Sequence, residues 1–188
     1  EIASCLVGSE MCIRDRPGTQ QDPLSGYASY YSKDNERALP GYYEVLLKTH
    51  RTKVELTASD RVAFHRYTFP KDVEKHVMIN LKDANGDDRP TDTYLEQIND
   101  TVIRGYRYST GWSKKQQIYF SAVFSQPVHL TLYHDSVQVA GNRLQGLDVK
   151  GNVAVAPVVE ELGVKVGISP VSMENAMDNI GPVSYTHL

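Results

Sequence analysis

The chain has 188 residues, of which 40% are hydrophobic and 23% are charged, and its formal net charge is −3. This length and composition are typical of one globular domain that can bury a core without disulfides or metals. The slightly negative charge gives no basic surface for nucleic acid, and no apolar run reaches the roughly 20 residues of a membrane helix. We therefore expect neither a nucleic-acid partner nor a membrane span.

The two ends of the chain differ from the rest. Residues 9–15 and 183–188 resemble translated sequencing-adapter sequence. A secretory signal is not predicted at the start, because no basic residue precedes a short apolar patch that Glu10 interrupts. We therefore predict non-native segments at 1–16 and 182–188, with native sequence cut at both ends between them. Cys5 and Cys12 both lie in the first segment and say nothing of a redox compartment; a disulfide between them is the alternative.

The strongest strand pattern lies between Pro40 and Phe69. Three short runs rich in β-branched and aromatic residues are separated by polar breaks, which favours antiparallel neighbours. Apolar and polar residues alternate over 53–58 and over 62–67, so each strand is predicted to have one buried and one solvated face. Pro40-Gly41 marks the turn into the first run. An antiparallel meander is thus the predicted nucleus of the domain.

Further short strands follow at near-regular spacing. They are predicted at 76–81, 93–99, 101–109, 117–124, 128–133, 136–140, 153–159 and 164–168, with a hairpin-like turn at 149–153. The strand 117–124 is apolar on both sides, so we expect it in the centre of a sheet with both faces covered. Ten to twelve such strands are typical of a β-sandwich. The predicted fold is therefore an all-β, antiparallel β-sandwich over residues 17–169.

One short C-terminal α-helix is predicted within residues 170–181. Ser172 is a suitable N-cap, and Met173, Ala176, Met177 and Ile180 form one apolar stripe at helical spacing. Two interpretations of the stripe stay open: it packs against this domain, or it docks onto a further domain.

No catalytic or metal-binding arrangement can be assigned from the residues alone. The sequence has no nucleophile elbow, Walker loop, dinucleotide glycine pattern or His-Glu-x-x-His motif, and its histidines lack metal-ligand spacing. The acidic stretch 83–87 could suggest calcium, but an EF-hand would place its bidentate Glu at Asp92, which is too short, so a surface turn is predicted. Glu160 and Glu161 are adjacent and cannot face each other as an acid and a base do.

Aromatic residues give the one candidate for sugar contact. Twelve Tyr against four Phe and one Trp is common on half-buried sheet faces and also where sugars stack. Trp112, in a Gly-Trp-Ser loop, is the predicted substrate-binding residue, with burial beneath the sheet as the alternative. Tyr106, Arg107 and Tyr108 have the same two interpretations.

Several segments together resemble the N-terminal domain of glycoside hydrolase family 92. They are residues 35–45, 54–58, 65–70 and 105–109, then Trp112, Tyr119-Phe120, Phe124-Ser125 and 164–169, with Ser172, Glu174, Asn175-Ala176 and Asn179. Their order and spacing cover nearly all of the chain between the predicted non-native ends. The resemblance implies a supersandwich-like fold for this domain, followed by a larger (α/α)₆ domain, with 170–181 as the start of a linker helix.

The resemblance also implies a function. Members of the family are calcium-dependent, inverting exo-α-mannosidases, largely bacterial and exported to the periplasm, cell surface or medium. Their acid, base and most calcium ligands belong to the larger domain, which is absent from this sequence, as is an early His-rich sugar-contacting motif. The implied protein is a fragment of an α-mannosidase, inactive alone and with no catalytic or metal-binding residue of its own. Its implied partners are α-mannose-containing glycans and its own C-terminal catalytic domain.

A free-standing carbohydrate-binding or adhesion β-sandwich is the alternative function. An exposed apolar stripe on the C-terminal helix would favour the enzyme fragment, because a solitary module has no reason to expose one.

Overall fold

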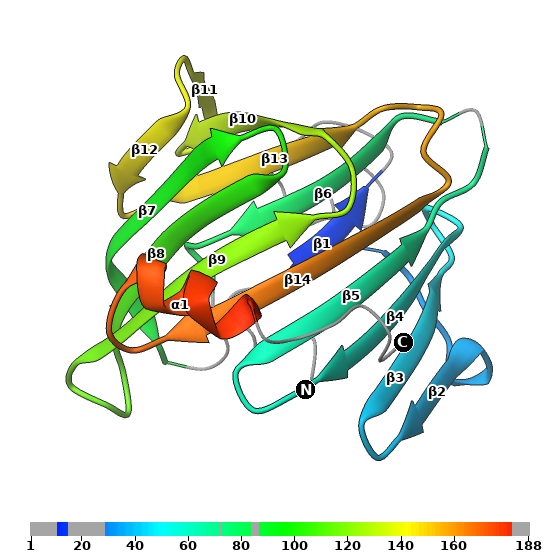
Figure 1. The fold of residues 1–188 in the computed structure, drawn as a ribbon, viewed down its shortest axis with the longest axis horizontal. Coiled ribbons are helices and arrows are strands. Elements are labelled where there is room, and N and C mark those ends of the chain that lie inside the picture. Colours follow the sequence, from blue (N-terminus) through cyan, green and yellow to red (C-terminus); the bar gives the residue numbers. More distant parts are fainter. Residues whose placement is uncertain (1–10, 15–28, 72, 84–86, 182–188) are drawn as a thin grey trace.

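Two antiparallel sheets packed face to face form the domain (Figure 1). The computed structural model describes residues 11–14, 29–71, 73–83 and 87–181. Within these residues the prediction of an all-β antiparallel sandwich with one short C-terminal α-helix is confirmed.

The larger sheet has nine strands and carries the C-terminal helix on its outer face (Figure 1). In spatial order its strands are β12 (Arg143–Gly146), β7 (Arg89–Asn99), β8 (Val102–Thr110), β9 (Gln116–Phe124), β14 (Glu161–Ser169), β5 (Val62–Thr68), β4 (Thr52–Ala58), β3 (Tyr42–Leu47) and β2 (Glu36–Leu39). A single 3₁₀ turn, Lys33–Asn35, precedes β2.

The smaller sheet has five strands and lies behind the larger one in Figure 1. Its strands, in spatial order, are β1 (Met11–Arg14), β6 (Lys75–Asn80), β13 (Val149–Val155), β10 (Val128–His134) and β11 (Val137–Val139). The edge strand β1 pairs with β6, with Met11 opposite Ile79. It falls within the segment 1–16, whose non-native origin stays a prediction; the other predicted non-native residues, Cys5 included, lie outside the described residues.

The meander predicted between Pro40 and Phe69 is confirmed. β2, β3, β4 and β5 pair in sequence order, and the turn between β2 and β3 places Gly41 at a φ of +78°, which glycine adopts without strain. Val54 and Leu56 of β4 are buried in the core, as their alternation predicts. The expectation of one solvated face is wrong for β5, because Val62 and Phe64 on its outer face are also buried, under the C-terminal helix.

A second prediction, the turn at 149–153, is wrong. Residues 149–155 form β13 in the middle of the smaller sheet, paired with β6 and β10. A Cβ atom at Gly151 would lie 2.4 Å from Leu95 Cδ2 and 2.7 Å from Leu130 Cδ1. The glycine therefore serves close approach between the sheets, and not a change of chain direction.

The core lies between the sheets and draws on both. Leu95, Ile103 and Leu162 from the larger sheet meet Val77, Leu132 and Val153 from the smaller one, all fully buried. β9 lies between β8 and β14, with Phe120 and Ala122 in this core and Ser121 buried on the outer face. The expectation of a central strand covered on both sides is thus confirmed.

The helix α1 (Met173–Ile180) packs on the outer face of β14, β9 and β8. Its N-cap is Ser172, as predicted, whose hydroxyl accepts a hydrogen bond from Asn175 N at 3.0 Å. Ala176 and Ile180 are buried, and Ile180 packs with Val62 and Phe64. The stripe is therefore covered by this domain's own sheet, and the argument that an exposed stripe favours an enzyme fragment does not hold.

Candidate functional site

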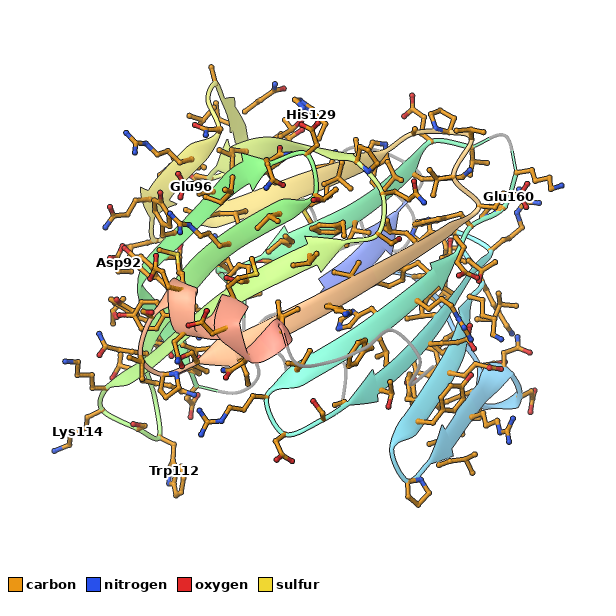
Figure 2. All side chains as sticks on the ribbon, in the orientation of Figure 1. Asp92, Glu96, Trp112, Lys114, His129 and Glu160 are labelled. Atoms are coloured by element: carbon orange, nitrogen blue, oxygen red, sulfur yellow. The ribbon has the colours of Figure 1, made fainter. Side chains whose placement is uncertain are left out.

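Trp112 lies at the tip of the loop that joins β8 to β9, residues 111–115, and points away from the domain (Figure 2). Its side chain is fully exposed, at 106% of its reference area. The loop is braced by hydrogen bonds from Gly111 N to Ser113 O, at 3.0 Å, and from Ser113 Oγ to Lys115 O, at 3.1 Å. Burial beneath the sheet, the alternative for Trp112, is therefore excluded.

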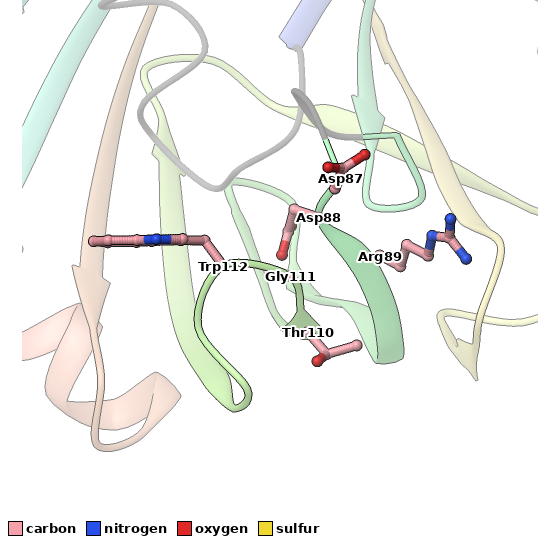
Figure 3. A pocket seen from close by; sticks show the side chains of 6 residues that line it. All are labelled: Asp87, Asp88, Arg89, Thr110, Gly111 and Trp112. Carbon is pink, nitrogen blue, oxygen red and sulfur yellow. The ribbon is translucent and has the colours of Figure 1, made fainter.

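A hollow of about 540 Å³ opens beside this loop, and we call it the Trp112 pocket (Figure 3). It is lined by Asp87, Asp88, Arg89, Thr110, Gly111 and Trp112. The segment before β7 forms one wall and the loop after β8 the other. Gly111 permits their close contact, because a Cβ atom there would lie 2.9 Å from Asp88 Cα. The pocket thus combines one large aromatic surface with carboxylates and a guanidinium.

Asp88 is held from below by a buried arginine. Arg107 points inward from β8, with 2% of its side chain exposed, and its Nη1 donates a hydrogen bond to Asp88 Oδ2. Its Nε donates to Leu81 O at 3.0 Å, so the planar guanidinium is fixed at two points. Nη2 is buried and has no hydrogen-bond partner among the described residues. Arg107 therefore fixes the Asp88 carboxylate and cannot itself contact a sugar at the surface.

Tyrosines form a stacked row on the outer face of β7, β8 and β9. Tyr106 lies between Tyr94 and Tyr108, with ring centroids 5.5 and 4.4 Å away and interplanar angles of 14° and 22°. Tyr108 and Tyr119 share a hydrogen bond of 2.6 Å between their hydroxyls. Burial and a hydrogen bond to Asp92 raise the pKa of Tyr106 above its ordinary value. Both faces of the Tyr106 ring are covered, so a sugar cannot stack on it.

A charged cluster occupies the outer face of β3, β4 and β5. Arg66 donates two hydrogen bonds to Glu55, at 2.7 and 2.8 Å, and Lys53 lies 3.0 Å from Glu44. The Tyr42 hydroxyl is 2.6 Å from Glu44 and 2.7 Å from Glu55. The hydrogen bond from Arg66 lowers the pKa of Glu55 to about 2. These carboxylates are neutralised by neighbours on the same sheet, so the cluster stabilises the fold and offers no free acid or base.

The described residues contain no metal site. No group of three or more His, Cys, Asp or Glu among them could hold a metal ion. Asp92, the position that an EF-hand would need, lies in β7 and accepts hydrogen bonds from Tyr106 and Gln145. The strands predicted on both sides of the acidic turn are present as β6 and β7, while residues 84–86 lie outside the described part, so the turn itself stays a prediction.

The model of the glycosyl hydrolase family 92 N-terminal domain matches residues 9–169. The chain belongs to this family. The comparison with curated proteins found no match to this chain.

Solved structures agree with the family assignment. A family GH92 alpha-mannosidase from Bacteroides thetaiotaomicron is 30% identical, with a TM-score of 0.82, over 93% of this chain and 25% of that chain. The same mannosidase in complex with mannoimidazole gives 30% identity and a TM-score of 0.80, over 94% and 24% of the two chains. A GH92 inverting mannosidase from B. thetaiotaomicron VPI-5482 shares the fold at 18% identity and a TM-score of 0.76, over 95% and 24%. The GH92 N-terminal domain described above thus spans about a quarter of the mannosidase chains that it matches.

Sequence reasoning identified Trp112 and Arg107 as candidates for sugar contact, and it missed the pairing of Arg107 with Asp88. On β8, Ile103, Gly105, Arg107 and Ser109 are buried, so Arg107 stands at an inward position of an alternating strand. An arginine at such a position requires a buried or half-buried acidic partner. That signal indicates a carboxylate nearby, although it does not identify Asp88, 19 residues earlier in the chain.

Proposed function

We propose that this domain is the N-terminal part of an exo-α-mannosidase that removes α-mannose from glycans by an inverting mechanism. The observation that carries the proposal is the 30% identity to an alpha-mannosidase over 93% of this chain. Inversion requires two carboxyl groups roughly 6.5–9.5 Å apart on either side of the scissile bond. We assign both groups to a second domain, reached through the linker that begins with α1.

In this proposal the sandwich forms one wall of the carbohydrate site and supports the catalytic domain. Trp112 is the residue that contacts the substrate, since a fully exposed indole offers an apolar face to a sugar ring. The chain alone is expected to hydrolyse no mannoside. Asp88, a carboxylate of the Trp112 pocket, is already hydrogen-bonded to Arg107.

Calcium and export complete the proposal. We assign the calcium ion of the parent enzyme to the second domain, because the described residues offer no cluster of ligands for it. The parent is expected in the periplasm, on the cell surface or in the medium. A helix that crosses a bilayer needs about 20 residues; α1 has eight, and the described part of the chain contains no helix that meets the requirement.

The test is to extend the reading frame in the source DNA and to assay both proteins on an aryl α-mannoside. We expect native sequence to continue into a helical domain rich in carboxylates, and the extended protein to release the aryl group in a reaction that a calcium chelator stops. The 188-residue chain should release none. An extended protein without mannosidase activity, or a fragment with it, would refute the proposal.

A free-standing carbohydrate-binding or adhesion module is the second candidate. It is favoured by one observation, that the apolar stripe of α1 is covered by the domain's own sheet and needs no further partner. A native stop codon soon after Ile180, together with glycan binding by the chain alone, would select this candidate.

A further inference from the structure

The Trp112 pocket contains a carboxylate whose direction is fixed before any ligand arrives. We propose that this pocket is a carbohydrate subsite in which Trp112 covers the apolar face of a sugar ring and Asp88 accepts hydrogen bonds from adjacent hydroxyls. Arg107 is the positioning residue for Asp88. The identity of the sugar as a mannoside rests on the proposed function; the subsite itself rests on the geometry of the pocket.

The pocket has the size and mixed chemistry of a small-ligand site. Its volume of about 540 Å³ lies within the range of about 300–1,000 Å³ that is usual for such sites. The loop that carries Trp112 lines one side, and Asp88 and Arg89, at the start of β7, line the other. In Figure 3 the indole and the Arg89 side chain project to opposite sides, with Asp88 between them. Sugars present the same combination, since one face of the ring carries C–H groups while its rim carries hydroxyls.

Asp88 retains acceptor capacity after its bond to Arg107. A carboxylate has about four lone-pair positions, and Arg107 Nη1 uses one on Oδ2. The side chain is 22% exposed, so a ligand in the pocket can reach it. Hydrogen bonds to an ionised acceptor are roughly twice as strong as neutral ones. Hydroxyls on neighbouring ring carbons can donate to the two oxygens at once, which favours a sugar over an apolar ligand.

Arg107 acts only through Asp88. It is buried, does not line the pocket, and is held by Leu81 O on its other side. The hydrogen bond from Arg107 holds the Asp88 carboxylate in one orientation. A ligand can therefore form hydrogen bonds to this carboxylate without the entropic cost of ordering it first.

The exposure of Trp112 is the second reason to expect a ligand here. Tryptophan is on average a highly buried residue, yet this side chain is more exposed than any other large apolar side chain in the described residues. Contact with a protein domain would also cover the indole. Such contact does not require Asp88 to accept hydrogen bonds from a free sugar, and this difference decides the test.

The experiment uses the intrinsic fluorescence of Trp112, which is the single tryptophan of the chain. Methyl α-mannoside and α-mannan are titrated into the 188-residue chain, into Asp88→Asn, and into Asp135→Asn as the control. Asp135 lies in the exposed turn between β10 and β11 at a φ of +46°, where asparagine is well tolerated. We expect a saturable shift of the emission to shorter wavelength in the wild type and the control, and affinity weakened about tenfold or more in Asp88→Asn.

Three further measurements keep the test independent of a folding defect in Asp88→Asn. The carboxyl ¹³C resonance of Asp88 in the wild-type chain should shift when methyl α-mannoside is added, and Trp112→Ala, which alters an exposed side chain, should lose binding by calorimetry. Arg107→Lys keeps the positive charge but loses the planar guanidinium. This substitution should weaken sugar binding when made in the wild-type chain, and it should cause no further loss of affinity when made in Asp88→Asn. A structural defect alone would be additive.

No saturable fluorescence change, no shift of the Asp88 resonance, or equal affinity in a folded Asp88→Asn variant would each overturn the subsite. The proposed function fails separately. If the extended protein hydrolyses aryl mannosides while the 188-residue chain binds no sugar, the subsite alone is overturned. If the chain binds another sugar through Asp88 while the extended protein has no mannosidase activity, the proposed function alone is overturned.

Discussion

Helix α1 packs so closely on β14 that one methyl group should displace it. A Cβ atom at Gly167 would lie 2.1 Å from Ala176 O and 2.8 Å from Ile180 Cγ1. The nearer atom belongs to the backbone, so no change of rotamer relieves the contact. In Gly167→Ala the helix must therefore move outward by roughly 1 Å, which a close-packed interface does not absorb.

The cost can be worked out from the contacts that hold α1. Ser121 Oγ donates to Met173 O at 2.8 Å, and Asn179 Nδ2 donates to Ile168 O at 3.0 Å. Overpacking costs about 1–3 kcal/mol, and each weakened hydrogen bond about 1 kcal/mol. We expect the free energy of unfolding of Gly167→Ala, from equilibrium urea denaturation, to fall by about 3–5 kcal/mol.

The control is the same substitution at the end of the helix. Gly181 has a helical φ of −52°, and a Cβ atom there would lie 3.5 Å from Asp178 O, which is ordinary contact. Gly181→Ala should therefore change stability by only a few tenths of a kcal/mol. If Gly167→Ala is as stable as Gly181→Ala, α1 does not pack on β14 as described, and its apolar stripe is again available to a partner.

Three other predictions concern stability. Burial lowers the pKa of His65 to about 4, below its unfolded value of about 6.5. The free energy of unfolding should therefore fall by roughly 3 kcal/mol as the pH falls from about 6.5 to 4. In urea unfolding, His65→Gln should show a flatter dependence of stability on pH, and an unchanged dependence would contradict this assignment. Ser172→Ala removes the N-cap bond to Asn175 N and should cost about 1 kcal/mol by the same assay, whereas Ser172→Thr should retain most of it; equal losses would argue against capping. A double-mutant cycle of Glu55→Gln and Arg66→Met should give a coupling free energy of unfolding above about 1 kcal/mol, because Arg66 donates two hydrogen bonds to the buried Glu55. A coupling free energy near zero would show that the ion pair is not formed in solution.

Much of the sandwich was predictable because its strands alternate. In β4 the inward side chains, Val54 and Leu56, are apolar, and the outward ones, Lys53 and Glu55, are charged, so a period of two identifies both the strand and its buried face. The C-terminal helix was predictable for the same kind of reason, since its N-cap and its apolar stripe are local in sequence.

Gly151 shows what local patterns cannot supply. Glycine followed by asparagine is a frequent turn signal, and here it forms part of a central strand. What decides its role is Leu95, which lies 56 residues earlier and on the opposite sheet. Until it is known which residues of the two sheets contact each other, a glycine needed for close approach cannot be told from a glycine needed for a turn.

The candidate site was predictable only in part, for a similar reason. Trp112 is conspicuous in sequence as the single tryptophan in a polar loop. Asp88 is one of several acidic residues in its neighbourhood, and it acquires its place from the buried guanidinium of Arg107. The pairing depends on how β7 and β8 align, which the sequence does not state directly.

One wrong expectation and one open question have the same physical cause, and resolving them changes where a partner should be sought. The outer face of β5 was expected to be solvated and the stripe of α1 was open to a partner; instead each covers the other, through Phe64 and Ile180. Burial of both removes the helix as evidence for a further domain. Among the described residues, Trp112, in the loop that follows β8, is then the most exposed large apolar side chain. The response of Asp88 to a free sugar distinguishes the two kinds of partner, because sugar hydroxyls can donate to a carboxylate that lines the same pocket as Trp112.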